Sequence, residues 1–134
     1  MYNKEEFSTW LEKGLSSMKN ENGFCINLYE DSDDSITCEL VGCDEFTKDD
    51  GEWDFEETAV FSRETPFILF TPQDNKKQTF YKTLQIFADN LNKLVENNPI
   101  IQSYLKNKKL AFGFVDRDLY FLGVSGQSIV ADWE

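Results

Sequence analysis

Hydrophobic side chains recur at helical spacing near the start of the chain, at Phe7, Trp10, Leu11, Leu15 and Met18. This spacing places them on one face of a helix, which the pattern predicts over residues 4–19. The helix has a start signal, because Asn3 is a favoured N-cap and Glu6 stands three residues later, as in a capping box. Such faces mostly pack inward in small domains, so we expect the stripe to join the core.

The longest helical pattern lies in the second half of the chain. Its apolar positions are Phe80, Leu84, Phe87, Ala88, Leu91, Leu94 and Val95. They predict a helix over residues 76–97, with Asn75 as its N-cap. Pro99 lies just beyond its end, as expected because the residue before a proline avoids helical geometry. A further short helix is expected over residues 100–105.

Alternation of apolar and polar residues predicts a first β-hairpin. Residues 24–29 and 36–41 each alternate with a period of two, as half-buried strands do. Between them, the sequence Asp31-Ser32-Asp33-Asp34-Ser35 has residue types that form turns by bonding their own backbone. Two antiparallel strands joined by an acidic turn are therefore expected here.

The region after this hairpin has weaker signals. Residues 43–57 place three aromatic side chains between acids, and we interpret this region as an irregular loop or a short helical turn. Residues 58–62 and 67–71 favour β-structure. The second of these runs is flanked by prolines, which indicates an edge or terminal strand because proline cannot donate to a ladder.

A second hairpin is predicted near the C-terminus. Residues 110–115 and 118–122 form its strands if two residues, Asp116 and Arg117, make the loop. This register places Phe112 opposite Phe121, with the large side chains of both strands on one side. A three-residue loop is an alternative, because a type I′ turn prefers glycine at its second position.

The predicted order is a helix, strands, a long helix and more strands. That order indicates an α+β fold with a mostly antiparallel sheet, on which the N-terminal helix and the long central helix pack. A chain of 134 residues is expected to form a single globular domain over residues 1–134. Its twelve Phe, five Tyr and three Trp supply a packed core, unlike a disordered acidic tail.

Charge is concentrated in one segment of the chain. Residues 30–57 contain thirteen acids and a single base, Lys48, so their net charge of −12 equals that of the whole chain. The other 106 residues hold twelve acids and twelve bases. Charge spread over the surface would serve solubility equally well, so the concentration indicates a surface that meets a basic partner.

The candidate partner-binding residues come from this acidic segment. They are Asp31, Asp33, Asp34, Asp44, Glu45, Asp49, Asp50, Glu52, Trp53, Asp54, Glu56 and Glu57. Trp53 is included because an exposed aromatic anchor ringed by carboxylates is typical of interface hot spots. An alternative interpretation is that Trp53 fastens a long loop to the core.

Other chemistry has little support in the sequence. The chain contains no histidine, which excludes Ser-His-Asp triads and histidine-ligated metals. The three cysteines lack zinc-ligand spacing and are expected to be free thiols in a reducing compartment. Negative charge disfavours nucleic-acid binding, and no uncharged run reaches the ~20 residues of a membrane helix. We therefore expect no cofactor, no metal, no nucleic acid and no membrane association.

Several short motifs add a resemblance to a known class of proteins. They are Phe7…Trp10-Leu11, Asn27-Leu28-Tyr29-Glu30, Leu40-Val41-Gly42-Cys43-Asp44-Glu45-Phe46 and Gly113-Phe114-Val115-Asp116-Arg117-Asp118. Together they resemble small acidic immunity proteins of bacterial polymorphic-toxin systems. The resemblance implies a cytoplasmic, non-enzymatic protein that neutralises a cognate toxin by binding it.

The leading hypothesis is therefore an immunity protein whose acidic segment covers a basic surface of a toxin domain. An accessory interaction domain of another bacterial complex would use the same segment for a different basic partner. A carboxylate- or metal-dependent enzyme is a third alternative, which the sequence favours less because nothing in it selects two catalytic acids and its acidic loops do not match the EF-hand pattern; an irregular calcium site stays open. The sequence does not predict the oligomeric state.

Overall fold

The computed structural model describes residues 3–18, 21–31, 35–49, 52–72, 80–115, 120–122 and 129–130. The helices within these residues are α1 (Lys4–Ser17), α3 (Phe80–Glu96) and α4 (Pro99–Leu105). The strands are β1 (Gly23–Glu30), β2 (Ile36–Asp49), β3 (Glu52–Phe61), β4 (Phe67–Phe70), β5 (Lys109–Phe114), β6 (Tyr120–Leu122) and β7 (Ile129–Val130). Strands and helices lie in separate runs along the chain, so the protein has the α+β fold that its sequence predicts.

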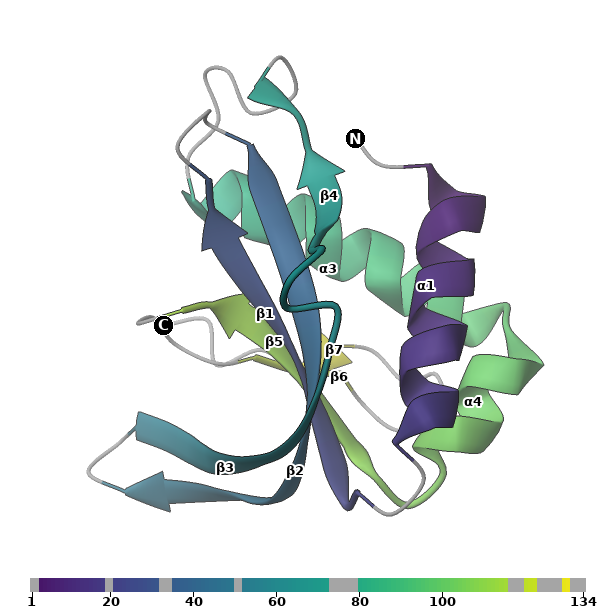
Figure 1. Ribbon diagram of the computed structural model, residues 1–134, viewed down its shortest axis with the longest axis vertical. Coiled ribbons are helices and arrows are strands. Elements are labelled where there is room, and N and C mark those ends of the chain that lie inside the picture. The colour runs from purple at the N-terminus through teal and green to yellow at the C-terminus, as the bar shows by residue number, and fades with distance from the viewer. Residues whose placement is uncertain are drawn as a thin grey trace.

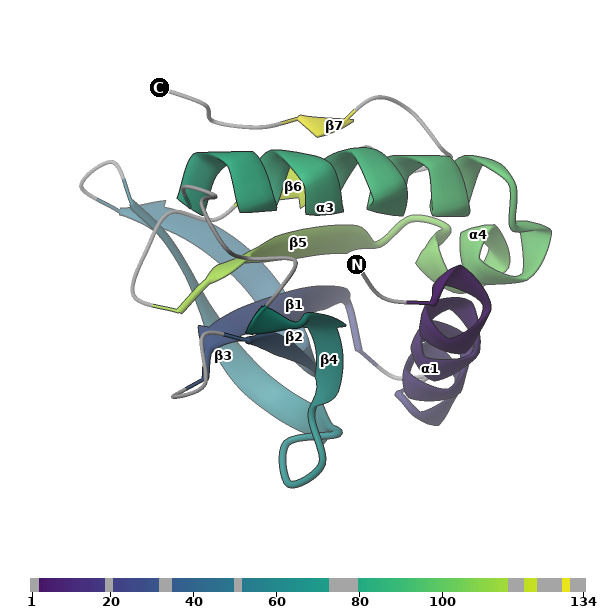
Figure 2. The ribbon, with the colours of Figure 1, turned by 90° about the horizontal axis from the view of Figure 1, so that it is seen from above.

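One sheet joins the described strands in the order β3-β2-β1-β5-β6-β7, with β4 also paired to β2. Among these pairs only β1 and β5 run parallel, so the sheet is mostly antiparallel as predicted. A parallel pair needs a long crossover connection, and α3 and α4 lie within it. The helix α3 lies across the sheet, whereas α1 and α4 lie together at one side of the molecule (Figures 1 and 2).

The first predicted hairpin and the predicted edge strand are both confirmed. β1 and β2 pair antiparallel from Glu30 opposite Ile36 onward, and Asp31 N–H donates to Ser35 O at 2.8 Å. Residues 32–34 lie outside the described residues. β4, in the stretch flanked by prolines, pairs with β2 alone among the described strands.

The helix α1 begins where the sequence predicts. Asn3 Oδ1 accepts hydrogen bonds from the backbone N–H groups of Glu5 and Glu6 at 2.9 and 3.2 Å. These bonds satisfy donors that have no partner within the helix. The predicted apolar stripe joins the core as expected, and the buried residues of α1 are Phe7, Leu11, Gly14 and Leu15.

A row of aromatic rings crosses the core. The ring of Phe7 in α1 lies 5.9 Å from that of Phe87 in α3, and Phe87 lies 5.7 Å from Phe112 in β5. Phe112 in turn lies 5.9 Å from Tyr120 in β6. Edge-on and tilted contacts of this kind stabilise a core beyond the burial of the rings. The N-terminal helix and the C-terminal strands therefore share one hydrophobic core.

The second half of the chain contains both predicted helices. The long one, α3, is described from Phe80 onward, and residues 73–79 with the predicted cap Asn75 lie outside the described residues. The short one, α4, is capped by Asn98, whose side-chain oxygen accepts from two backbone N–H groups of the first turn. The amide group of Asn98 also donates to Ser8 Oγ and Glu12 Oε1, both at 3.0 Å, so the same residue holds α4 against α1.

The interpretation of residues 43–57 as an irregular loop or helical turn is wrong. β2 and β3 run through this region as an antiparallel pair that extends to Asp49 opposite Glu52. Asp50 and Gly51 alone separate the two strands, and Asp-Gly between strands is a strong hairpin signal. The register shifts on both sides of Cys43, and the two successive acids Asp44 and Glu45 interrupt the alternation of apolar and polar positions in β2.

The predicted register of the second hairpin is wrong by one residue. β5 and β6 pair Phe112 with Tyr120 and Ala111 with Phe121, so Phe121 does not lie opposite Phe112. A loop longer by one residue shifts a register in this way, as in the three-residue alternative. Residues 116–119 lie outside the described residues. Beyond β6, β7 pairs antiparallel with it and extends the sheet.

Gly14 marks a close approach between α1 and the sheet. A Cβ atom there would lie 2.6 Å from Leu40 Cδ2 and 2.8 Å from Phe61 Cδ2, and Leu40 is fully buried. We expect Gly14→Ala to lower the free energy of unfolding by about 1 kcal/mol, because a steric cost of about 1–3 kcal/mol exceeds the ~1 kcal/mol gained in helix propensity. Urea denaturation followed by circular dichroism measures this change. Thr9→Ala, at an exposed position of α1, is the control and should not destabilise; a Gly14→Ala protein more stable than the wild type would contradict the prediction.

Candidate functional site

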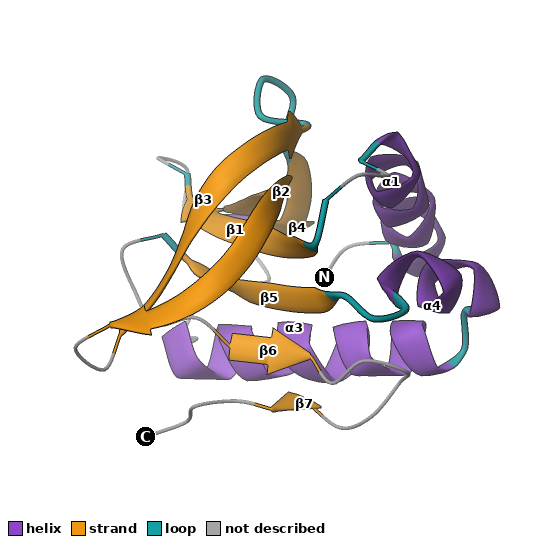
Figure 3. Cartoon of the chain, turned by 90° about the horizontal axis from the view of Figure 1, so that it is seen from below, coloured by secondary structure: helices purple, strands orange, loops and turns teal. Residues whose placement is uncertain are grey.

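Part of the acidic segment forms a two-stranded arm at one end of the sheet. β1 pairs with β2 as far as Cys43, and beyond this residue the described parts of β2 and β3 pair with each other alone. We call residues 44–56 the acidic arm. They contain seven acids and one base, so half of the chain's net charge of −12 lies in thirteen residues. The arm points away from α1 and α4 (Figures 1 and 3).

The structure distributes the predicted site residues over several places. Asp44, Glu45, Asp49, Glu52, Trp53, Asp54 and Glu56 belong to the strands of the acidic arm, and Asp44 is exposed. Glu57 is exposed at the base of the arm. Asp33, Asp34 and Asp50 lie outside the described residues.

Asp31 lies apart from the arm. It is exposed at the opposite end of β2, next to the pair of Glu30 with Ile36. At 3.4 Å per residue, Ile36 and Asp44 are separated by roughly 27 Å along the strand. The acidic segment is therefore not one continuous surface, and the arm is the part that the fold keeps together.

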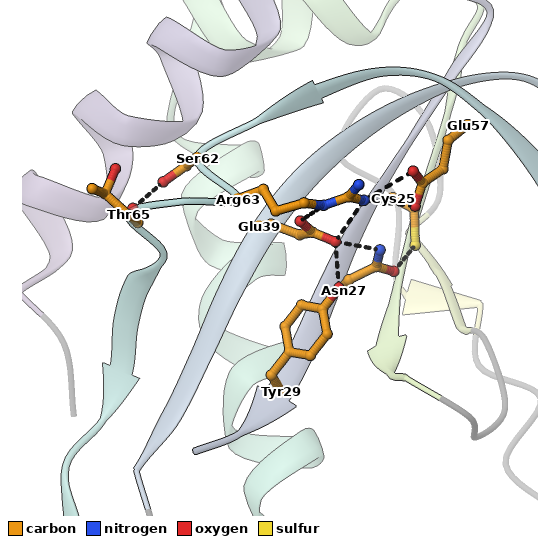
Figure 4. A network of polar contacts seen from close by, with 8 residues as sticks. All are labelled: Cys25, Asn27, Tyr29, Glu39, Glu57, Ser62, Arg63 and Thr65. Atoms are coloured by element: carbon orange, nitrogen blue, oxygen red, sulfur yellow. Dashed lines mark hydrogen bonds and ion pairs between the residues drawn. The ribbon is translucent and has the colours of Figure 1, made fainter. Parts of the chain in front are cut away.

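Glu39 is the exception among the acids whose side chains are described, because it is buried. Its neighbours Cys38 and Leu40 belong to the hydrophobic core, so Glu39 points to the opposite face of the sheet. There Asn27 Nδ2 donates to Glu39 Oε1 at 3.2 Å, and the Tyr29 hydroxyl donates to the same oxygen (Figure 4). Both partners come from β1, which lies beside β2 in the sheet.

Arg63 closes this network from the connection between β3 and β4. Its Nε donates to Glu39 Oε2 at 2.8 Å, and its Nη2 donates to both carboxylate oxygens of Glu57 at 2.9 Å. Ser62, with a φ of 72°, adopts the left-handed conformation just before Arg63, at the turn where the chain leaves β3. The side chain of Arg63 is 50% exposed, against 1% for Glu39 and 39% for Glu57. A half-exposed cation thus bridges a buried acid to an acid at the base of the arm.

The environment of Glu39 keeps it ionised. Burial alone would raise the pKa of this carboxyl, but the hydrogen bonds from Arg63, Tyr29 and Asn27 outweigh burial and lower the pKa below its ordinary value of 4.5. Burial and the hydrogen bond to Glu39 raise the pKa of Tyr29 to about 12, so its hydroxyl remains a donor. The two carboxylates raise the pKa of Arg63.

These groups are arranged to hold one another and not to react. Cys25 Sγ donates to Asn27 Oδ1 at 3.2 Å, and burial raises the pKa of this thiol, which makes it a poor nucleophile. Arg63 already pairs with two carboxylates, so it is a weak attractor for a further anion. The network therefore fastens the base of the acidic arm to β1 and β2 and acts as a positioning element.

Sequence reasoning missed Asn27, Tyr29 and Arg63 as members of this site. The first hairpin's pairing places Asn27 directly opposite Glu39, and the register follows from the turn between the strands. Arg63 is the single base between Lys48 and Lys76, which makes it the nearest available partner along the chain for a buried acid. Together, these two signals predict contacts of Glu39 with Asn27 and Arg63, but they do not predict that Glu39 is buried.

A second feature is an open groove of about 660 Å³ between α1 and the β3–β4 connection. Its lining residues are Glu5, Glu6, Thr9, Trp10, Lys13, Phe61, Ser62 and Thr65. The lining contains charges of both signs and two aromatic side chains. This mixture favours no particular class of ligand, so we do not assign the groove a role.

No protein-family model, curated protein or solved structure matches this chain. Its class is thus defined by its own fold and site: an α+β protein with an acidic two-stranded arm fastened by a buried carboxylate network. Within the described parts of the chain, none of the helices has the length and apolar character needed to cross a membrane.

The buried position of Glu39 predicts a large effect of removing its charge. We expect Glu39→Gln to lower the free energy of unfolding by about 2 kcal/mol. The substitution removes the charge that strengthens the hydrogen bonds to Glu39, and it places the amide NH2 of Gln against side chains that are themselves donors. Glu57→Gln is the matched control on the same arginine, and its effect should stay within about 0.5 kcal/mol because Glu57 is exposed. Urea denaturation at neutral pH compares the two variants. Equal losses in both would contradict a special role for Glu39.

The lowered pKa of Glu39 predicts a stability change in acid. A carboxyl whose pKa is lower in the folded than in the unfolded state contributes fully above its unfolded value of 4.5, and loses this contribution as pH falls through the folded value. The difference in unfolding free energy between wild type and Glu39→Gln should therefore be constant from about pH 7 to about pH 5 and shrink below about 4.5. Denaturation curves at successive pH values test this. A difference that persists unchanged to about pH 2 would show that the ionised form of Glu39 is not what stabilises the fold.

Proposed function

We propose that this chain is a non-enzymatic protein-binding domain that covers a basic surface of a partner protein with its acidic arm. The observation that supports this most directly is the geometry of the arm. Half of the net charge lies in thirteen residues of a hairpin that extends past the pairing of β1 with β2. Charge on a projecting element can enter a partner's basic cleft, whereas the same charge spread over a sheet cannot.

The physical properties of the arm fit electrostatic docking. Its β2 portion, Asp44–Asp49, is roughly 20 Å long at 3.4 Å per residue. A concentration of one sign of charge speeds the encounter with an opposite surface and excludes surfaces of the same sign. The Glu39–Arg63–Glu57 network holds the base of the arm in a defined place, which lowers the entropy lost on binding.

We propose further that the partner is a toxin domain and that the chain acts in the bacterial cytoplasm as its immunity protein. This step rests on the resemblance of the short motifs to acidic immunity proteins, together with the charge of the arm. An accessory interaction domain of another bacterial complex would use the same arm on a different basic protein. Toxicity of the partner in the absence of this chain distinguishes the immunity function from the accessory-domain function.

A growth experiment tests this function. The gene next to the one for this chain is expressed alone and together with it, and growth and co-elution of the two proteins are measured. Growth arrest by the neighbour and its relief by this chain, with a complex whose affinity falls as salt rises, is the expected result. A neighbour that is harmless, or relief without a complex, would contradict the immunity function.

Neutralising the arm should weaken that interaction without unfolding the protein. We expect the combined change of Asp49, Asp50, Glu52 and Asp54 to Asn or Gln to slow association about tenfold or more and to flatten its salt dependence. The matched control neutralises Glu5, Glu64, Asp89 and Glu96, four exposed acids outside the arm. Surface plasmon resonance measures the rates and urea denaturation the stability. Equal slowing by both variants would show that net charge, and not the arm, drives association; a collapse of stability in the arm variant would show that its acids are structural.

A further inference from the structure

The outer edge of β3 is the longest unpaired strand edge in the described part of the sheet. β3 stands at one end of the strand order and pairs with β2 alone among the described strands. Alternate residues of its ten-residue span, Glu52–Phe61, therefore direct their backbone N–H and C=O groups away from β2. An edge of this length is a template for pairing with another chain, and natural proteins usually protect it.

The protection on this edge is selective in charge. β3 contains no proline and no lysine, the residues that commonly protect an edge against every other strand. Its four charged residues, Glu52, Asp54, Glu56 and Glu57, are all acidic. A second copy of β3 would meet these acids with its own, which disfavours pairing between copies. A strand rich in lysine or arginine would meet them with the opposite charge.

The register of β3 divides its edge into two parts. Four consecutive pairs, from Phe46 with Phe55 to Asp49 with Glu52, show no shift. The shifts lie further back, on both sides of Cys43. Bulges twist a strand and discourage an additional neighbour, so the regular distal part, Glu52–Phe55, is the better template.

The opposite edge of the arm is a poorer template. It belongs to β2, whose free part begins only after Cys43 because β1 occupies the edge up to that residue. An added strand there would meet the start of β1, where Asn22 N–H donates to Cys43 O at 3.2 Å. Its charge is also mixed, since Lys48 lies among the acids.

We propose that the outer edge of β3 takes up an extended, lysine- or arginine-rich segment of the partner protein as an additional β-strand. The inference rests on the proposed function and adds the mode of binding to it. Backbone hydrogen bonds to the edge fix the position of the segment, and the acids of β3 select its charge. This mode is the β-augmentation form of peptide recognition, with basic side chains as its specificity element.

Two synthetic peptides test the proposal on the full chain. The first alternates lysine and valine, and the second has the same sequence with a methyl group on every backbone nitrogen. Methylation keeps the charge and the side chains but removes all backbone donors and obstructs the edge. The affinity of each peptide is measured by calorimetry at low salt, and hydrogen exchange maps the amides that become protected.

The expected result is that methylation weakens binding about tenfold or more and that the unmethylated peptide protects amides within Glu52–Glu57. Three results would overturn strand addition: equal binding of the two peptides, new protection confined to residues 44–49 of β2, or no binding of either peptide. In the first of these, salt-dependent binding without a backbone requirement leaves the electrostatic function intact. The growth experiment judges that function independently, so failure of one proposal is distinguishable from failure of the other.

Discussion

The pairing of β1 on both of its edges is the constraint on which the rest of this structure depends. β1 runs antiparallel to β2 and parallel to β5, so it joins the acidic N-terminal strands to the C-terminal half of the chain. Its residues from Gly23 to Leu28 are all buried, with Phe24, Ile26 and Leu28 in the hydrophobic core. Because both edges and both faces are occupied, β1 fixes the origin of the arm at the point where its pairing with β2 stops.

The same strand supplies the polar face that steadies the arm. Asn27 and Tyr29 donate to Glu39 from one side while Arg63 approaches from the β3–β4 connection. A buried carboxylate without partners would be strongly destabilising, and these donors offset the desolvation of Glu39 inside the sheet. The resulting network links β1, β2 and the start of the β3–β4 connection. An arm that is otherwise a two-stranded hairpin, marginal by itself, thus has a firm base.

The acidic arm combines a high density of negative charge with a strand edge at the end of the sheet. The remaining 121 residues share the other half of the net charge, whereas residues 44–56 combine seven acids with a strand edge that is unpaired among the described strands. The acids set which partners can approach, since they repel acidic surfaces and other copies of the same strand. The strand edge supplies directional backbone groups that charge alone lacks. Under the proposed function, such a surface selects a partner first by the sign of its charge and second by its backbone geometry.

Sequence alone determined what depends on local periodicity and composition. The helices beginning at Lys4 and Pro99, the first hairpin and the α+β class follow from residue spacing and capping side chains, because helices and short hairpins are stabilised by neighbours along the chain. Tertiary structure decided what depends on residues distant in sequence. β2 and β3 pair through register shifts beside Cys43, Phe112 lies opposite Tyr120 and not Phe121, and the charge count could not tell buried Glu39 from exposed Asp44. Burial and strand order come from packing against β1 and β5, and the sequence pattern of a single segment contains no information about its neighbours across the sheet.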